Sequence, residues 1–151
     1  MELTQFDKEL LNLVQTGLPL TPAPFADLAA RLGCPEQQVI ERLARLREQG
    51  IIRRLGAFFD AEALGYRGWL VAVKVAPAQL AAVAQTVNDW PEVTHNDERD
   101  HEYNLWFTIQ ARTEARQQEL LRQVGAMAGV SAVIALPTTD RYKVNVEFRM
   151  E

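Results

Sequence analysis

The chain has 151 residues, of which 48% are hydrophobic and 24% are charged, and its formal net charge is −4. This length suits one domain of ordinary size or two small ones. The negative charge disfavours a protein whose main partner is nucleic acid, because phosphate neutralisation supplies most of that affinity, and the sequence has no apolar run of the roughly 20 residues that cross a membrane.

Residues 1–9 contain neither the basic start nor the apolar core of a signal peptide, so we expect a cytoplasmic protein without a membrane partner. Cys34 is the only cysteine, which excludes an internal disulfide. A zinc site is not expected either, because no second cysteine or nearby histidine accompanies it.

Three helical patterns occupy the first half of the chain. They are expected at 4–16, 25–32 and 35–50. Thr4 is typical of a helix N-cap. Residues 50–59 have the β-branched and aromatic content of a strand pair, or wing. Together these elements predict a winged helix-turn-helix domain over residues 1–60.

The second half alternates strands and helices. Strands are expected at 68–75, 103–110 and 130–136, residues 90–96 are expected to form a turn that leads into a further strand, and helices are expected at 77–88 and 113–126. The order βαββαβ predicts a ferredoxin-like domain over residues 61–151, an antiparallel sheet with two helices on one face. Residues 142–148 alternate polar and apolar side chains and predict a further strand or a dimer-forming arm. The fold class is therefore α+β.

Both histidines of the chain, His95 and His101, lie within one short stretch, residues 93–108. An arginine, a tyrosine, an asparagine and a tryptophan accompany them. A strand-like run needs neither imidazole for packing, so this stretch is the first candidate for chemistry.

A winged helix followed by a ferredoxin-like domain resembles the Lrp/AsnC family of transcription regulators over nearly the whole chain. Within that architecture, residues 50–54 and 95–108 are similar to those of the sirohaem (siroheme) decarboxylase subunits. The pattern His-Asn-x-x-Arg-x-His-x-Tyr-Asn-x-Trp-Phe runs from His95 to Phe107. A transcription regulator of this fold has no evident need for that pattern.

The resemblance implies a carboxy-lyase of haem biosynthesis, which removes two acetate carboxylates of siroheme to give 12,18-didecarboxysiroheme. It also implies a heterodimer with a homologous, paralogous subunit. Iron would enter with the siroheme, so no further cofactor and no metal site of the chain's own are expected. The alternative is an Lrp/AsnC-type DNA-binding regulator that senses a small ligand or haem. DNA binding is not expected, because the third helix would present Glu36 and Glu41 to phosphate.

Siroheme carries eight carboxylates, so its pocket needs several cations. The candidates for substrate binding are Arg53, Arg54, Arg99 and Lys143, and guanidinium groups suit carboxylates because they bind both oxygens in one plane. For Arg53 and Arg54 two other roles stay open, contact with DNA phosphate and simple exposure at a strand edge.

The candidate catalytic residues are His95, His101 and Tyr103. An imidazole can supply a proton near neutral pH, and either histidine could instead bind the substrate iron. Tyr103 is a second proton donor or a carboxylate ligand, and Asn104 is expected to orient an imidazole or bind substrate. Trp106 and its neighbour Phe107 point to opposite faces of a strand, so Trp106 is assigned to the pocket and Phe107 to the core.

Asp97 is a departure from the family pattern, which has an aromatic residue, often tyrosine, at this position. A carboxylate pointing into the pocket would repel a polyanionic substrate. Whether this subunit or its partner holds the working pocket stays open from the sequence.

Overall fold

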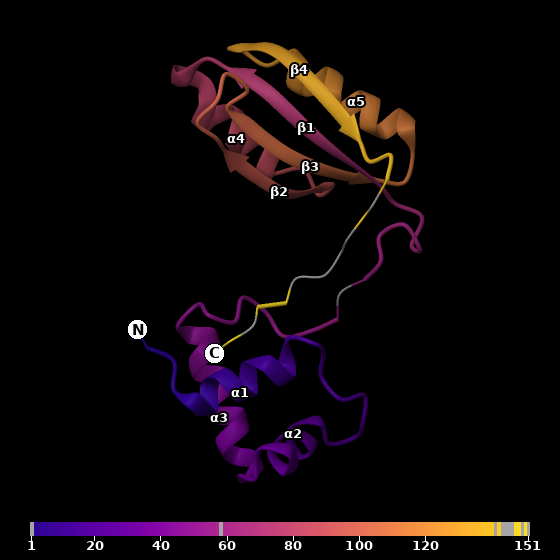
Figure 1. Cartoon of the computed structure of the whole chain (residues 1–151). Coiled ribbons are helices and arrows are strands. Elements are labelled where there is room, and N and C mark those ends of the chain that lie inside the picture. The colour runs from indigo at the N-terminus through magenta and orange to yellow at the C-terminus, as the bar shows by residue number, and fades with distance from the viewer. Residues whose placement is uncertain (1, 58, 141, 143–146, 149, 151) are drawn as a thin grey trace. The chain divides into compact units, whose positions relative to one another are not determined.

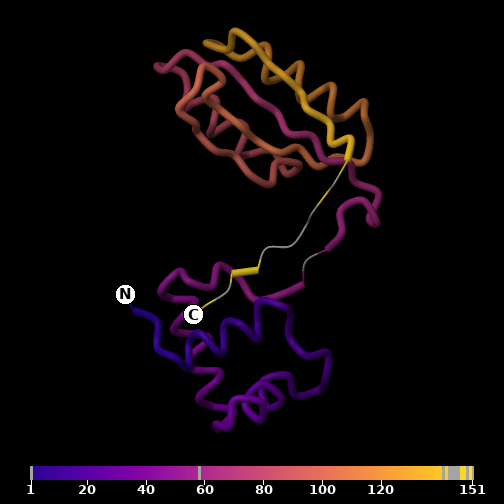
Figure 2. The backbone as a smooth tube through the Cα atoms, viewed as in Figure 1, coloured from indigo at the N-terminus to yellow at the C-terminus, as the bar shows by residue number. Residues whose placement is uncertain are grey.

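The computed structural model describes residues 2–57, 59–140, 142, 147, 148 and 150. Contacts divide the chain into two compact units, residues 1–58 with 143–151, and residues 59–142. The division predicted from the sequence was residues 1–60 and residues 61–151. Figure 1 and Figure 2 show a helical unit and a unit built on a sheet.

The first unit consists of three helices around an apolar core, as predicted. They are α1 (Gln5–Val14), α2 (Pro24–Leu32) and α3 (Glu36–Glu48). Thr4 caps α1 by accepting a hydrogen bond from the Asp7 backbone N–H, and the Asp7 carboxylate accepts from the Thr4 backbone N–H. Leu10, Leu28 and Val39 are each almost fully buried between the helices.

An ion pair joins α1 to α3 beside this core. Arg42 donates from two guanidinium nitrogens to the two carboxylate oxygens of Asp7, whose side chain is 1% exposed. The hydrogen bond from Arg42 holds the pKa of the Asp7 carboxyl well below its usual range, against the opposing effect of burial.

The prediction of a wing at residues 50–59 was wrong. None of the described residues of this stretch, 50–57 and 59, lies in a strand. Ile51 and Ile52 donate their backbone N–H groups to the Leu46 carbonyl, which continues the end of α3, and Ile52 is buried in the helical core. A strand needs a neighbouring backbone as a hydrogen-bond partner, and β-rich composition alone does not supply one.

The second unit has the predicted βαββαβ order. Its elements are β1 (Arg67–Val75), the 3-10 turn η1 (Pro77–Gln79), α4 (Leu80–Asn88), β2 (Val93–Glu98), β3 (Leu105–Ala111), α5 (Glu114–Gly125) and β4 (Val130–Pro137). The strands form one antiparallel sheet in the order β2-β3-β1-β4. Both helices cover one face (Figure 1), and the ferredoxin-like prediction is confirmed.

The core of this unit lies between the sheet and its two helices. Val71 and Val73 of β1 and Phe107 and Ile109 of β3 are buried there, against Leu120 of α5 and its neighbours. Phe107 is 1% exposed, which confirms its assignment to the core. Trp90 meets the Phe107 ring edge-on with ring centroids 6.4 Å apart.

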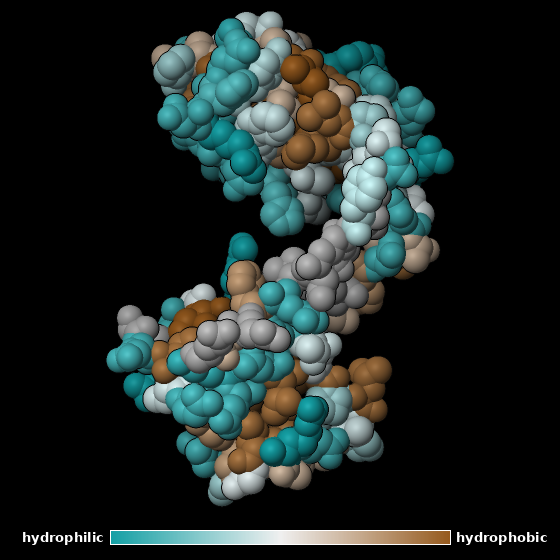
Figure 3. Space-filling view, in the orientation of Figure 1, coloured by the Kyte–Doolittle hydropathy of each residue, from teal (hydrophilic) through white to brown (hydrophobic). Residues whose placement is uncertain are grey.

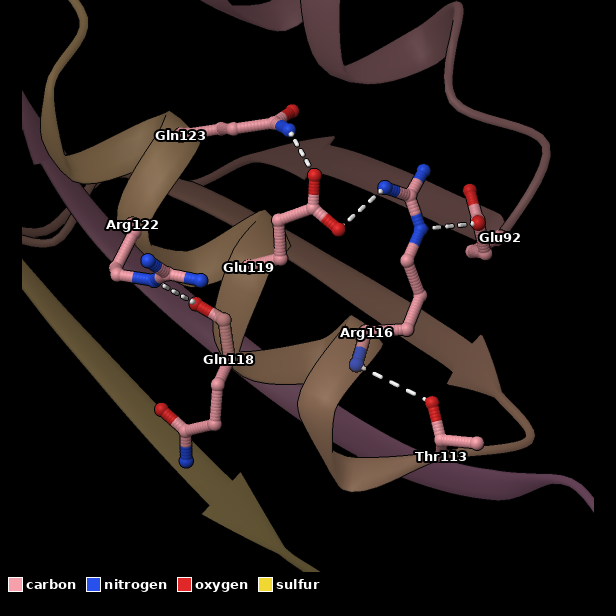
Figure 4. A network of polar contacts seen from close by, with 7 residues as sticks. All are labelled: Glu92, Thr113, Arg116, Gln118, Glu119, Arg122 and Gln123. Carbon is pink, nitrogen blue, oxygen red and sulfur yellow. Dashed lines mark hydrogen bonds and ion pairs between the residues drawn. The ribbon is translucent and has the colours of Figure 1, made fainter.

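A polar network fixes the start of α5 against the start of β2 (Figure 4). Thr113 caps α5 by accepting from the Arg116 backbone N–H. The Arg116 guanidinium donates to Glu92 at 2.7 Å and to Glu119 at 3.0 Å. The hydrogen bond from Arg116 lowers the pKa of the Glu92 carboxyl. The network holds the start of α5 to the residue before β2, while the second carboxylate oxygen of Glu92, Oε2, is buried without a hydrogen-bond partner among the described residues.

The last described residues of the chain contact α1. The Asn12 side chain donates to the Met150 carbonyl and accepts from its N–H, at 3.1 and 3.3 Å, and Phe148 N–H donates to the Gln15 side chain at 2.9 Å. Residues 143–146, the middle of the predicted strand or arm, lie outside the described residues. Within the part of the chain that is described, no helix is long and apolar enough to cross a membrane.

Candidate active site

The candidate residues are arranged by the hairpin of β2 and β3. Along β3, Leu105, Phe107, Ile109 and Ala111 are buried against the helices, so Trp106 and Thr108 lie on the opposite side of the sheet. We call this side, the one opposite α4 and α5, the open face.

Cross-strand pairing places residues of β2 on the open face as well. His95 pairs with Thr108 and Asp97 pairs with Trp106, and directly opposed residues share a face. Asn96, between them, points to the helices and donates to the Ala84 carbonyl of α4 at 3.0 Å. His95 and Asp97 are both exposed.

The turn between the two strands, residues 99–104, is closed by backbone hydrogen bonds. Arg99 N–H donates to the Asn104 carbonyl and His101 N–H donates to the Arg99 carbonyl, both at 2.9 Å. The His101 ring is nearly parallel to that of Tyr103, with 22° between the planes and 6.1 Å between the centroids.

One hydrogen bond selects the tautomer of His101. Its Nδ1 lies 3.1 Å from the Tyr103 backbone nitrogen, whose N–H must donate. Nδ1 is therefore the acceptor, and in the neutral ring the proton is on Nε2. The turn thus presents His101 with its proton on the outer nitrogen.

Asn104 fastens this turn to β1. Its Oδ1 accepts from the Val75 N–H and its Nδ2 donates to the Val75 carbonyl, both at 2.9 Å. Because both ends of the amide are engaged by one backbone, Asn104 acts as a positioning residue for the turn. Its predicted contact with an imidazole or with substrate stays a prediction.

Trp106 connects the turn to the open face. Its indole Nε1–H donates to the Tyr103 carbonyl at 2.6 Å, and the Arg99 guanidinium lies over its ring, 5.6 Å from the centroid. An aromatic face in this position stabilises a cation without neutralising it. Arg99 therefore keeps its charge available to an anion.

Further along the open face, apolar side chains are exposed. Leu70 of β1 and Ile134 and Leu136 of β4 are 40%, 38% and 44% exposed, and the pairs Leu70–Leu136 and Ala72–Ile134 are neighbours in the sheet. Figure 3 shows hydrophobic residues gathered on this face of the second unit, with hydrophilic residues beside them. An apolar patch next to a cationic, imidazole-bearing turn suits a large amphiphilic anion.

Two family models match the chain. The model described as siroheme decarboxylase NirDL-like HTH domain matches residues 7–53, and that of the AsnC-like ligand binding domain matches residues 63–143. The siroheme decarboxylase alpha subunit of Desulfovibrio desulfuricans is 41% identical over 99% of this chain and 86% of its own length. The chain belongs to the siroheme decarboxylase family. The Pseudomonas aeruginosa siroheme decarboxylase NirG subunit is 38% identical over 95% of this chain and 97% of its own length.

Solved structures agree with this family and fold. The siroheme decarboxylase NirDL is 33% identical, with a TM-score of 0.71, over 98% of this chain but only 48% of its own chain. A second NirDL structure, in complex with an iron-uroporphyrin III analogue, is 35% identical, with a TM-score of 0.69, over 88% of this chain and 44% of its own. Escherichia coli AsnC, at 16% identity and a TM-score of 0.82 over 97% of this chain and 99% of its own, shows the fold alone.

Within this siroheme decarboxylase family member, the hairpin brings together most of the predicted site. The residues gathered at the turn are Arg99, His101, Tyr103, Asn104 and Trp106. His95 is on the same sheet but three residue pairs beyond the Glu98–Leu105 pair, about 10 Å along the strand. Arg53 and Arg54 lie in the helical unit, both exposed, and Lys143 lies outside the described residues.

Sequence reasoning missed one ion pair at the site. Lys74 of β1 donates to the Glu102 carboxylate of the turn at 3.1 Å. Lys74 is 28 residues away in sequence, and only the pairing of β1 with β3 and β4 brings it to the turn. The alternation of buried and exposed residues along β1 predicts that Lys74 lies on the open face. The register between the strands is needed to show that Glu102 is its partner.

Proposed function

We propose that the chain is a subunit of siroheme decarboxylase that removes the two acetate carboxylates of siroheme to give 12,18-didecarboxysiroheme. The observation that carries this proposal is the identity of 38 to 41% over nearly the whole chain with siroheme decarboxylase subunits. The turn at residues 99–104 supports it independently, because it joins a cation, an imidazole and a phenol beside an apolar face.

Each decarboxylation breaks the bond between an acetate methylene carbon and its carboxylate carbon. Carbon dioxide leaves, and the electron pair stays on the methylene carbon, delocalised into the macrocycle. One proton must then reach that carbon to make a methyl group. We assign this proton to Nε2 of His101 in its imidazolium form. The neutral ring accepts from the Tyr103 N–H at Nδ1 and would become an imidazolate if it gave up the proton, so Nδ1 first takes up a proton and releases the Tyr103 N–H. Binding of the substrate iron is the role left for His95.

Binding of siroheme requires both cations and an apolar surface. In this proposal Arg99, held over the Trp106 ring, binds one carboxylate, and the macrocycle lies against the indole at the turn end of the open face. Arg53, Arg54 and Lys143 are further carboxylate ligands. The phenol of Tyr103 donates a hydrogen bond to a carboxylate or a proton. No cofactor beyond the substrate iron is proposed.

We further propose that the chain works in a heterodimer with a homologous subunit, through its open face. Relatives carry different subunit names, alpha, NirG and NirD. The chain spans less than half of the NirDL chain. The NirDL chain is therefore long enough to contain two copies of a subunit of this length. The exposed Leu70, Ile134 and Leu136 give the open face the apolar character of an interface core. We also propose that the complex is cytoplasmic and that it binds siroheme.

The DNA-binding regulator is the less favoured function. The helix-turn-helix is present, but α3 exposes Glu36 and Glu41, and a carboxylate in the recognition helix repels phosphate. The helical unit then serves as scaffold and as a source of Arg53 and Arg54.

Anaerobic incubation with siroheme, followed by mass spectrometry of the tetrapyrrole, tests the proposal. The chain is assayed with and without its co-expressed homologous partner. The expected product of the pair is lighter by two carbon dioxide units. Siroheme of unchanged mass, together with tight and salt-sensitive binding to operator-like DNA, would favour the regulator.

A further inference from the structure

Lys74 and Glu102 form an ion pair at the edge of the candidate active site. Lys74 is on β1, on the same face as Ala72, which is the cross-strand neighbour of Trp106. Its pair with Ala132 in β4 lies beyond the last pair of β1 with β3, Val73–Leu105. Lys74 is thus at the end of the sheet where the turn lies, and its Nζ is 3.1 Å from Glu102 Oε2.

The turn does not depend on this ion pair for its position. Asn104 already makes two hydrogen bonds with the Val75 backbone, and the Arg99 N–H closes the turn on the Asn104 carbonyl. The side chains of Lys74 and Glu102 are 46% and 60% exposed. An ion pair so exposed contributes little to stability, because water screens it and two long side chains must be ordered.

We propose that Lys74 is a substrate-binding residue and that Glu102 occupies it until a siroheme carboxylate displaces the Glu102 carboxylate. This inference rests on the proposed function. A substrate carboxylate can form the same charge-assisted hydrogen bond that Glu102 forms now. The exchange breaks one weak, exposed contact, whereas the incoming carboxylate belongs to a ligand that Arg99 and Trp106 hold at the same time.

Glu102 has a specific effect in this arrangement. Until substrate is bound, it neutralises Lys74 at a site that otherwise attracts any small anion. A ligand with one carboxylate must then compete with Glu102 unaided, whereas a polycarboxylate has other contacts. The ion pair therefore favours ligands that carry several carboxylates at once.

A double-mutant cycle tests this competition. The affinity for siroheme is measured by anaerobic absorbance titration of the chain with its homologous partner. The variants are K74A, E102Q and K74A/E102Q, with K74R as the conservative replacement. K74A should weaken binding about tenfold, as for loss of one charge-assisted hydrogen bond, with partial rescue in K74R. E102Q should tighten it about threefold, because the competitor is gone.

The decisive comparison is the effect of E102Q on siroheme affinity in the wild-type chain and in the K74A variant. If Glu102 competes for Lys74, its replacement gains nothing once Lys74 is absent. If Glu102 only repels the substrate by its charge, the gain persists or grows in K74A, and the inference is overturned. The matched control is E98Q, which removes one charge from β2 on the helix side of the sheet. A gain in E98Q equal to that in E102Q would likewise overturn the inference.

The outcomes also separate this inference from the proposed function. Siroheme binding that K74A leaves unchanged overturns the role of Lys74 but not the decarboxylase assignment. A wild-type complex that does not bind siroheme overturns both. Because both side chains are exposed, the variants should keep the wild-type melting temperature, and a large loss of stability would show a structural role instead.

Discussion

His101 is the residue on which the chemistry of the site depends. Its ring is fixed by the Tyr103 N–H at Nδ1 and by the Tyr103 ring at 6.1 Å. This contact fixes the orientation of the ring and leaves Nε2 as the nitrogen available for proton transfer to a bound substrate, and the ring donates that proton as the imidazolium.

We therefore expect His101→Ala to lower the rate of decarboxylation by at least about 100-fold and to change the affinity for siroheme far less. Single-turnover rates and absorbance titrations of the same preparation measure the two effects. His95→Ala is the contrasting variant, because it removes the proposed ligand of the substrate iron from the same hairpin and should lower affinity more than rate. Equal losses of rate and affinity in His101→Ala would make His101 a binding residue or the iron ligand.

Arg99 should show the reverse pattern. Replacing it with alanine removes a cation held over the Trp106 ring, and we expect about tenfold weaker binding with a nearly unchanged rate at saturating siroheme. Arg99→Lys keeps the charge but loses the planar group that binds both carboxylate oxygens, so an intermediate affinity is expected. A rate loss at saturation larger than the affinity loss would contradict this role.

Sequence alone predicted the site residues that strand alternation controls. It put Phe107 in the core and Trp106 on the other face, and both were confirmed. It could not show that Asn104 binds the Val75 backbone or that Glu102 meets Lys74. Those contacts depend on the register between strands that are distant in sequence.

At the scale of elements, periodicity was enough to predict every helix and strand of the second unit to within a few residues. The wing was wrong because residues 50–59 have strand-like composition but no strand among those described. Helices α1 and α3 were predicted from their apolar spacing. Their mutual ion pair, Asp7 with Arg42, was not, since it joins residues 35 positions apart.

That ion pair predicts how stability depends on pH. Arg42 depresses the pKa of Asp7 in the folded state, so unfolded chains take up the proton first as pH falls. The stabilisation is complete above about pH 4, the ordinary range of a free aspartate, and is lost as pH falls toward the folded-state pKa.

We expect Asp7→Asn to lower the free energy of unfolding at neutral pH by about 2 to 3 kcal/mol, as for a hydrogen bond to a charged partner. The deficit relative to wild type should be full above about pH 4 and should shrink as pH falls from there toward the folded-state pKa of Asp7. Denaturation followed by circular dichroism measures both. Glu41→Gln, on the exposed side of α3, is the control. A deficit that stays constant over this pH range would show that the charge of Asp7 is not what stabilises the unit.

At the scale of the whole molecule, the open face presents exposed apolar side chains on the adjacent strands β1 and β4. Leu136 of β4 is 44% exposed there. Leu136→Asp should weaken association with the homologous subunit at least tenfold, because a charge would have to be buried at the interface core. Sedimentation of the mixed subunits measures this. Leu20→Asp, at a fully exposed leucine of the helical unit, should leave association unchanged, and equal effects of the two would exclude the open face as the interface.

The two units explain why fold alone left the function open. A helix-turn-helix followed by a ferredoxin-like domain is shared with AsnC at 16% identity, so the architecture alone does not assign a function. The distinction came from one stretch, residues 95–107. In the structure that stretch is the hairpin of β2 and β3 with its turn, where Asp97 pairs with Trp106 on the open face.

The most direct test of this account is a crystal structure of the chain with its homologous partner and siroheme, obtained anaerobically. The account predicts the tetrapyrrole on the open face, with the turn at residues 99–104 contacting its carboxylates and His101 facing an acetate. Siroheme bound against α1 and α3, or bound only by residues of the partner, would contradict it.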